Sequence, residues 1–231
     1  MERIYYREQA LETIARRVVC AFDECLYYGP PMAIPIEEII ERNGLSLEYQ
    51  CLRKNGSILG KTIFDDGLET VYDQERHEYI LFPVTAGTIL IDASLCENEE
   101  SAGRLRFTCA HELAHWVLHK KLYQGTGESA AMNLATQEDD MEIQANILGS
   151  AILMPMAQVK RAFYRMRAGR GRDALVTDMA SLFQVSRQAD QAGKPSSDLI
   201  PFAVVFTKKR TVWGGIANAS YIYPSADLSM V

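Results

Sequence analysis

The stretch HELAHWVLH at residues 111–119 shapes the interpretation of the whole chain, because it holds three of the four histidines. His111 and His115 are four residues apart, which on an α-helix is about one turn and about 6 Å along the axis. Both imidazoles would therefore project from the same face, and Glu112 would stand about 100° round the helix from His111. The simpler alternative is a half-buried helix whose imidazoles have only a structural role.

This spacing suits a zinc site. Two imidazole nitrogens on one helix face can bind one zinc ion at about 2.0–2.1 Å. A glutamate that stands beside the ion without binding it is placed to act as general base for an activated water. We therefore predict His111 and His115 as metal ligands and Glu112 as the catalytic residue. An apolar stripe beside the pair would place the site inside the protein; it comprises Ala110, Leu113, Ala114 and Val117.

The third histidine of the stretch does not fit the same ion. His119 would lie about 12 Å from His111 on a continuous helix, which is too far for one zinc to bind both. We expect His119 to make a structural or outer-shell hydrogen bond instead.

A better third ligand lies in TQEDDMEIQANILGSAILMP, residues 136–155. On a helix, Glu142 shares a stripe with Ala145, Asn146 and Gly149, and the two small residues would let another helix approach closely. Glu142 could then reach the ion, and Asn146 could orient a ligand from the second shell. The alternative for Glu142 is a solvated surface carboxylate like the acids before it.

The rest of the chain alternates between helical and strand-like patterns. Helices are expected at about 8–28, after Pro35 as far as Gly44, from about residue 105, and at about 137–154. Short β-like runs fill residues 45–95. We expect an α+β fold in which a small β-sheet precedes the HExxH helix, and that helix packs on a second, ligand-bearing helix. Residues 1–190 would form this domain, with a helix-turn-helix-like segment at about 173–190, and residues 191–231 a strand-rich C-terminal extension.

Composition narrows the class of protein. The chain has 231 residues, 48% of them hydrophobic, and a net charge of −6, which argues against a general binder of nucleic acid or anionic membranes. Five scattered cysteines without a CxxC pair indicate reduced thiols. We find no signal-peptide pattern and no run of about 18–20 apolar residues for a membrane span. These features predict a cytoplasmic protein without membrane contact; its oligomeric state is open.

Two motifs together resemble a known family. RLRFTCAHELAHWVLH at residues 104–119, followed by EIQANILGSAILMP at 142–155, is similar to the ImmA/IrrE family of zinc metallopeptidases, with its RFTxAHELGHxxLH and ExxANxFAxxLLMP signatures. The similarity runs over roughly residues 8–190. It implies a compact, gluzincin-like metallopeptidase domain with His111, His115 and Glu142 as Zn²⁺ ligands and Glu112 as the catalytic glutamate. Several members of that family cleave a helix-turn-helix repressor of a mobile element, and others act in stress responses.

The chain departs from the family pattern in two places. Ala114 replaces the usual glycine between the ligands, which a helix tolerates well. MASLFQVSRQADQAGKP at 179–195 begins the LAxxFxVSxxAxxxRL pattern but loses its second half, because its helix must end by Gly193 or Pro195. This departure weakens any inference of DNA binding from the segment.

The function that we predict is zinc-dependent hydrolysis of a protein substrate, with a DNA-binding repressor as one candidate. GTILIDASL at 87–95 could offer an edge to an extended substrate, or could be an ordinary buried strand. The sequence does not choose among four residues that could stabilise the oxyanion: Tyr123, His77, Tyr164 and Arg106.

The alternative is a regulatory or binding module whose metal site is vestigial or structural. KRAFYRMRAGRGR at 160–172 has six bases and no acid, and could contact nucleic acid. A solvated basic helix face is the favoured interpretation of this stretch, because the whole chain is acidic.

Overall fold

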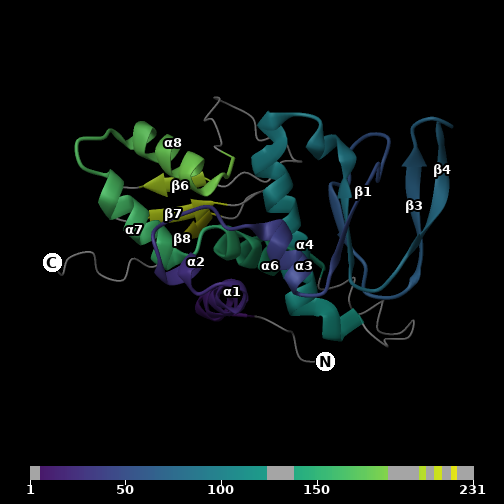
Figure 1. The fold of residues 1–231 in the computed structure, drawn as a ribbon, viewed down its shortest axis with the longest axis horizontal. Coiled ribbons are helices and arrows are strands. Elements are labelled where there is room, and N and C mark those ends of the chain that lie inside the picture. The colour runs from purple at the N-terminus through teal and green to yellow at the C-terminus, as the bar shows by residue number, and fades with distance from the viewer. Residues whose placement is uncertain (1–5, 124–137, 187–202, 207–210, 215–219, 223–231) are drawn as a thin grey trace.

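The computed structural model describes residues 6–123, 138–186, 203–206, 211–214 and 220–222. The fold is α+β, as predicted: helices gather on one side of a small sheet, and a separate β-hairpin lies beyond it (Figure 1). The helices are α1 (Glu8–Phe22), α2 (Cys25–Tyr28), α3 (Ile36–Arg42), α4 (Ala102–Tyr123), α6 (Glu138–Leu153), α7 (Met156–Met166) and α8 (Arg172–Phe183). The strands are β1 (Ser46–Gln50), β2 (Gly60–Thr62), β3 (Gly67–Asp73), β4 (Glu78–Val84), β5 (Thr88–Asp92), β6 (Ala203–Phe206), β7 (Thr211–Gly214) and β8 (Ser220–Ile222).

The central sheet has the order β1-β5-β2, with β1 parallel and β2 antiparallel to β5. Every residue of β5 is buried, which explains its continuous apolar sequence. The suggestion that residues 87–95 offer an edge to a substrate is therefore wrong, because β1 and β2 already pair with both sides of this strand. The strand at the edge nearest to α4 is β2.

Helix α4 is buried round most of its circumference. Its central residues, from Phe107 to His115, are all buried, between α6 on one side and β2, β5 and α3 on others. The sequence predicted one buried apolar stripe on this helix, but α4 runs through the interior of the protein and is buried on several sides. It also begins at Ala102, earlier than expected, since a 3-10 turn at Glu99–Ser101 leads directly into it.

Helix α6 packs closely on α4 at Gly149. A Cβ atom added at Gly149 would lie 3.0 Å from the His111 backbone nitrogen and 3.1 Å from the Ala110 carbonyl oxygen. A side chain at this position would push against the α4 backbone, so glycine suits this close approach. Gly149 thus has the role that the sequence pattern indicated.

The chain after α6 is less completely described. Helix α8 ends at Phe183, where Gln184 adopts a left-handed conformation at φ 53°. The second helix of the expected helix-turn-helix-like segment at 173–190 falls mostly outside the described residues. Strands β6, β7 and β8 form an antiparallel sheet within residues 191–231, and the division into two domains stays a prediction.

None of the helices in the described part of the chain combines the length and hydropathy that crossing a membrane requires.

Candidate metal centre

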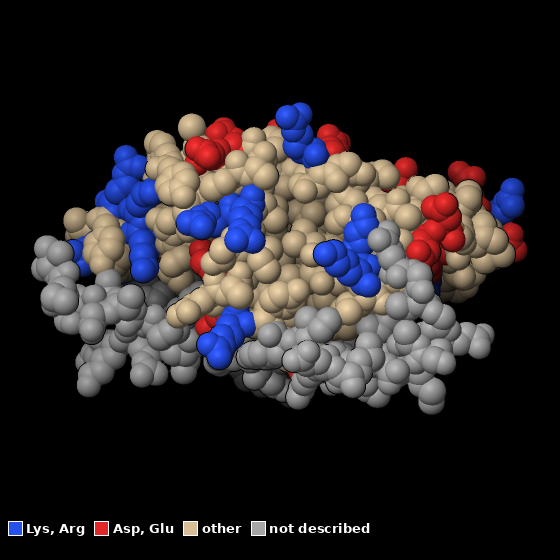
Figure 2. Space-filling model, turned by 90° about the horizontal axis from the view of Figure 1, so that it is seen from below, with Lys and Arg blue, Asp and Glu red and all other residues tan. Residues whose placement is uncertain are grey.

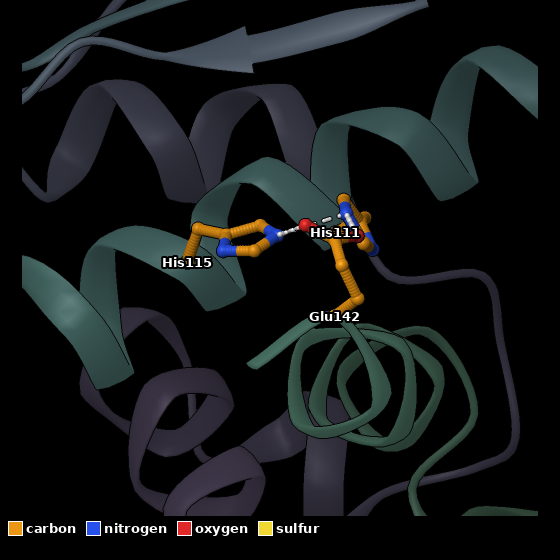
Figure 3. A group of neighbouring side chains, drawn as sticks. All are labelled: His111, His115 and Glu142. Atoms are coloured by element: carbon orange, nitrogen blue, oxygen red, sulfur yellow. Dashed lines mark hydrogen bonds and ion pairs between the residues drawn. The ribbon is translucent and has the colours of Figure 1, made fainter. Parts of the chain in front are cut away.

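Three side chains from two helices converge on one point (Figure 3). His111 and His115 of α4 and Glu142 of α6 each offer a ligand atom, and these atoms lie within 4.8 Å of one another. The two histidine Nε2 atoms are 3.0 Å apart. Glu142 Oε2 lies 3.2 Å from His111 Nε2, and its Oε1 lies 3.1 Å from His115 Nε2.

These distances suit a small tetrahedral ion. Bonds of about 2.0–2.1 Å in a tetrahedron separate the ligand atoms by about 3.3 Å, so the three groups need to move apart by only a few tenths of an ångström. Two nitrogens and one carboxylate oxygen also match the donor preference of zinc. The residues present therefore fit such an ion, and all three also line the cleft described below.

Glu142 is not the freely solvated carboxylate of the alternative interpretation. Its side chain is 50% exposed, yet its carboxylate is directed at the two histidines. Burial acts to raise the pKa of Glu142, but hydrogen bonds with His111 and His115 outweigh burial and lower the pKa. Burial acts to lower the pKa of His111. The hydrogen bond to Glu142 and the negative charge of Glu112 outweigh burial, so the pKa of His111 is raised overall. The Glu142 carboxylate and the His111 imidazole thus stabilise each other's charge.

Asn146 fixes the orientation of His111. Its Oδ1 lies 2.9 Å from His111 Nδ1, one helical turn beyond Glu142 on α6. An amide oxygen only accepts hydrogen bonds, so this contact requires the proton on Nδ1 and leaves the Nε2 lone pair facing the ligand position.

His119 lies beside His115 Nδ1, as Asn146 lies beside His111 Nδ1. The Nδ1 atoms of His115 and His119 are 3.1 Å apart. Burial, followed by the neighbouring His115, lowers the pKa of His119 to about 3, so the ring is neutral and can accept. A proton on His115 Nδ1 then leaves its Nε2 free to bind an ion.

Glu112 is held by strand β2. Only 6% of this residue is exposed, and the Thr62 hydroxyl lies 2.7 Å from its Oε2 and 2.8 Å from its backbone oxygen. A Cβ atom at Gly60 would lie 2.7 Å from Glu112 Oε1, so the strand approaches this carboxylate at a residue that has no side chain. The sequence did not predict a role in the site for either Thr62 or Gly60. They lie about fifty residues before Glu112, and only the glycine within a strand gave a weak signal.

A cleft of about 730 Å³ opens over these groups. Strand β2 and the start of β3 form one side, and α4 forms the other, with His111, Glu112, His115 and Glu142 in its lining. Phe64 and Tyr123 stack with ring centroids 4.4 Å apart at one part of its wall.

Of the four candidates for oxyanion stabilisation, Tyr123 lines this cleft, and the other three belong elsewhere. Arg106 donates to the Ile34 and Gln184 carbonyl oxygens. His77 lies in the turn between β3 and β4, and Tyr164 lies on α7 beneath Arg167.

The fold and the site together define a class: α+β proteins with an HExxH helix and a facing glutamate that could bind a metal ion. A family model described as Peptidase_M78, IrrE N-terminal-like domain, matches residues 69–192, more than half of the chain. The chain belongs to this family, which confirms the resemblance seen in its two motifs and supports a metallopeptidase-like domain. No curated protein matches the chain.

Proposed function

We propose that this protein is a zinc-dependent endopeptidase that cleaves a protein substrate in the cytoplasm. The observation that carries the proposal is the convergence of His111, His115 and Glu142 beside the Glu112 carboxylate, inside a cleft. All five cysteines are free thiols, which supports a reducing compartment. By analogy with the family, we propose a helix-turn-helix repressor of a mobile element or stress regulon as the substrate.

His111, His115 and Glu142 would hold the zinc ion. When bound, the ion would polarise the scissile carbonyl and acidify a water. Glu112 would accept the proton from that water and deliver it to the leaving amine, a role that contributes about 10²–10⁴-fold. The Thr62 hydroxyl binds Glu112 Oε2, so the carboxylate is held in one orientation while its other oxygen serves as the base.

The edge of β2 that has no partner strand among the described residues is the best support for an extended substrate. This strand pairs with β5 on one side, and the cleft lies along it. A peptide on this edge would place a carbonyl between the proposed ligands and Glu112.

The proposal is tested by separating metal binding from catalysis. Purified protein should contain about one zinc, as measured by elemental mass spectrometry. Glu112→Gln should keep the zinc and lose cleavage of β-casein, whereas His111→Ala should lose the zinc. Glu48→Gln, an exposed carboxylate on β1, is the matched control and should behave as wild type. Full cleavage by Glu112→Gln would show that this residue is not the base.

The substrate itself is best sought by comparison of protein N-termini in cells that express wild type or Glu112→Gln. A new N-terminus within a DNA-binding repressor, present only with wild type, is the expected result. New N-termini only in unrelated proteins would contradict the repressor as substrate.

The alternative of a nucleic-acid-binding module gains no support from the basic stretch at 160–172. Arg161 donates to the Tyr27 and Gly29 carbonyl oxygens, so its charge stabilises the end of α2. Arg170 pairs with Asp178 at 3.0 Å. The positive charge available to a ligand is therefore smaller than the sequence indicated.

A further inference from the structure

Strand β4 is apolar on both faces, although only one face is packed. Its sequence, EYILFPV, has the continuous apolar character of a strand buried on both sides. Ile80, Phe82 and Val84 pack in a small core under the hairpin. The alternate residues face solvent: Tyr79 is 51% and Leu81 64% exposed.

The partner strand extends this exposed surface. In the register of the hairpin, Leu68 of β3 lies opposite Pro83, and Thr70 lies opposite Leu81. Leu68 is 63% exposed. We call the exposed part of this surface the outer hairpin face; it comprises Leu68, Thr70, Tyr79, Leu81 and Pro83. Tyr72, opposite Tyr79, lies on the same side but is buried, with Lys54 over its ring. Contiguous exposed apolar side chains of this kind mark interaction sites.

The outer hairpin face continues into the proposed active-site cleft. Leu68 belongs to both, because it also lines the cleft that holds Glu112, together with its neighbours Gly67 and Glu69. A chain that leaves the cleft past β3 would therefore cross Leu68 and reach Leu81. The hairpin stands at the end of the molecule away from α7 (Figure 1).

Docking must use the face of β4 rather than its edge. Tyr72 donates its backbone N–H to the Cys51 carbonyl oxygen, away from β4. Tyr72 and Tyr79 are therefore a pair without backbone hydrogen bonds to each other, and the backbone N–H of Tyr79 points away from β3. Pro83 is four residues from Tyr79, so its backbone nitrogen points the same way, to the edge of β4 that has no partner strand in the described part of the chain. Because proline has no N–H, a strand added there would lack this donor, which protects the edge against pairing with another chain, including a second copy.

Charge indicates the chemistry of the partner. Asp65 and Asp66 lie near the cleft end of the outer hairpin face, and Glu75 and Glu78 lie at the turn end. Of the bases near this face, Lys61 and Arg76 are paired with Glu69 and Asp73. Arg53 donates to the Leu52 and Thr70 carbonyl oxygens, and Lys54 lies over the Tyr72 ring without an acidic partner among the described residues. In Figure 2, acidic side chains gather at this end of the molecule beside a basic one, and most of the basic side chains lie over the middle and the opposite end, with acidic ones among them.

We infer that the outer hairpin face is a docking surface for the protein substrate, and that it binds an extended apolar segment flanked by Lys or Arg. This inference rests on the proposed peptidase function. Apolar contact with Leu68 and Leu81 supplies the affinity, and the flanking acids select the basic ends of the segment.

The test uses two fluorescein-labelled peptides with the same core, Val-Leu-Val-Leu, flanked by two lysines or by two glutamates on each side. Their binding to full-length Glu112→Gln protein is measured by fluorescence anisotropy. We expect the lysine-flanked peptide to bind about tenfold or more tighter than the other, and Leu81→Ser to weaken it about tenfold. Met32→Ser is the matched control, because Met32 is 47% exposed and lies outside the hairpin; it should leave binding unchanged.

Equal affinity for the two peptides, or unchanged affinity in Leu81→Ser, would overturn the inference. A dimer in light scattering that Leu81→Ser dissociates would also overturn it, because the face would then be covered by a second copy. Failure of the proposed function has a different signature: the wild type would contain no zinc or cleave no β-casein, while the anisotropy measurement still reports on the hairpin.

Discussion

Replacement of Thr62 by valine tests how β2 contributes to catalysis. Valine keeps the shape of threonine but removes the hydroxyl that lies 2.7 Å from Glu112 Oε2. Glu112 as a residue is only 6% exposed, so water can replace the lost donor only in part. A hydrogen bond to a charged group contributes about 1.5–3 kcal/mol, which corresponds to a fall in kcat of about 10- to 100-fold if the bond maintains the reactive orientation.

The assay is steady-state cleavage of β-casein, with zinc content measured on the same samples. We expect Thr62→Val to lower kcat with little change in KM or in zinc, because Thr62 contacts none of the three proposed ligands. Thr62→Ser keeps the hydroxyl and should recover most of the lost rate. The reasoning is refuted if valine has no effect, if serine is as damaging as valine, or if zinc is lost together with activity.

Three further predictions concern the two helices. His119→Phe should weaken zinc binding about 10- to 100-fold in a chelator competition, because His115 loses the acceptor for its Nδ1 proton; unchanged affinity would mean that His119 only fills space. Gly149→Leu should lower the free energy of unfolding, measured in urea, by about 1–3 kcal/mol or more, because the side chain would overpack against α4. Gly171→Leu is the control: no atom lies within 4 Å of its added Cβ, so the free energy of unfolding should change by less than about 0.5 kcal/mol. In zinc-free protein, the lowered pKa of Glu142 contributes stability above pH 4.5, and this contribution is lost as the pH falls. The raised pKa of His111 contributes stability below pH 6.5, and this contribution is lost as the pH rises. The thermal midpoint should therefore peak between those values, and Glu142→Gln should flatten the profile; an equal peak in that variant would exclude the pair as its cause.

The helical part of the site could be predicted because helical spacing is local. One turn separates His111 from His115, and another separates Glu142 from Asn146, so each pair shares a face wherever its helix lies. The close approach of α6 at Gly149 followed from the same periodicity. What the pattern could not supply was the distance between the helices, which depends on packing across the core.

The strand part of the site could not be predicted in the same way. The contact between Thr62 and Glu112 joins residues fifty positions apart, and it depends on β2 pairing with β5 at one particular register. The apolar run of β5 was compatible with both an edge and a buried strand, and only the pairing decides between them. The burial of α4 on several sides could not be predicted from its pattern either. Its polar residues His111, Glu112 and His115 are buried together with its apolar ones, so the polar positions do not mark a solvent-facing side.

The most direct test of the proposed metal centre is anomalous diffraction at the zinc absorption edge from crystals of the purified protein. The account predicts one strong peak bonded to His111 Nε2, His115 Nε2 and a Glu142 carboxylate oxygen, at about 2.0–2.2 Å from each. A peak bound by other residues, or a zinc bound by the histidines with Glu142 turned away, would contradict it.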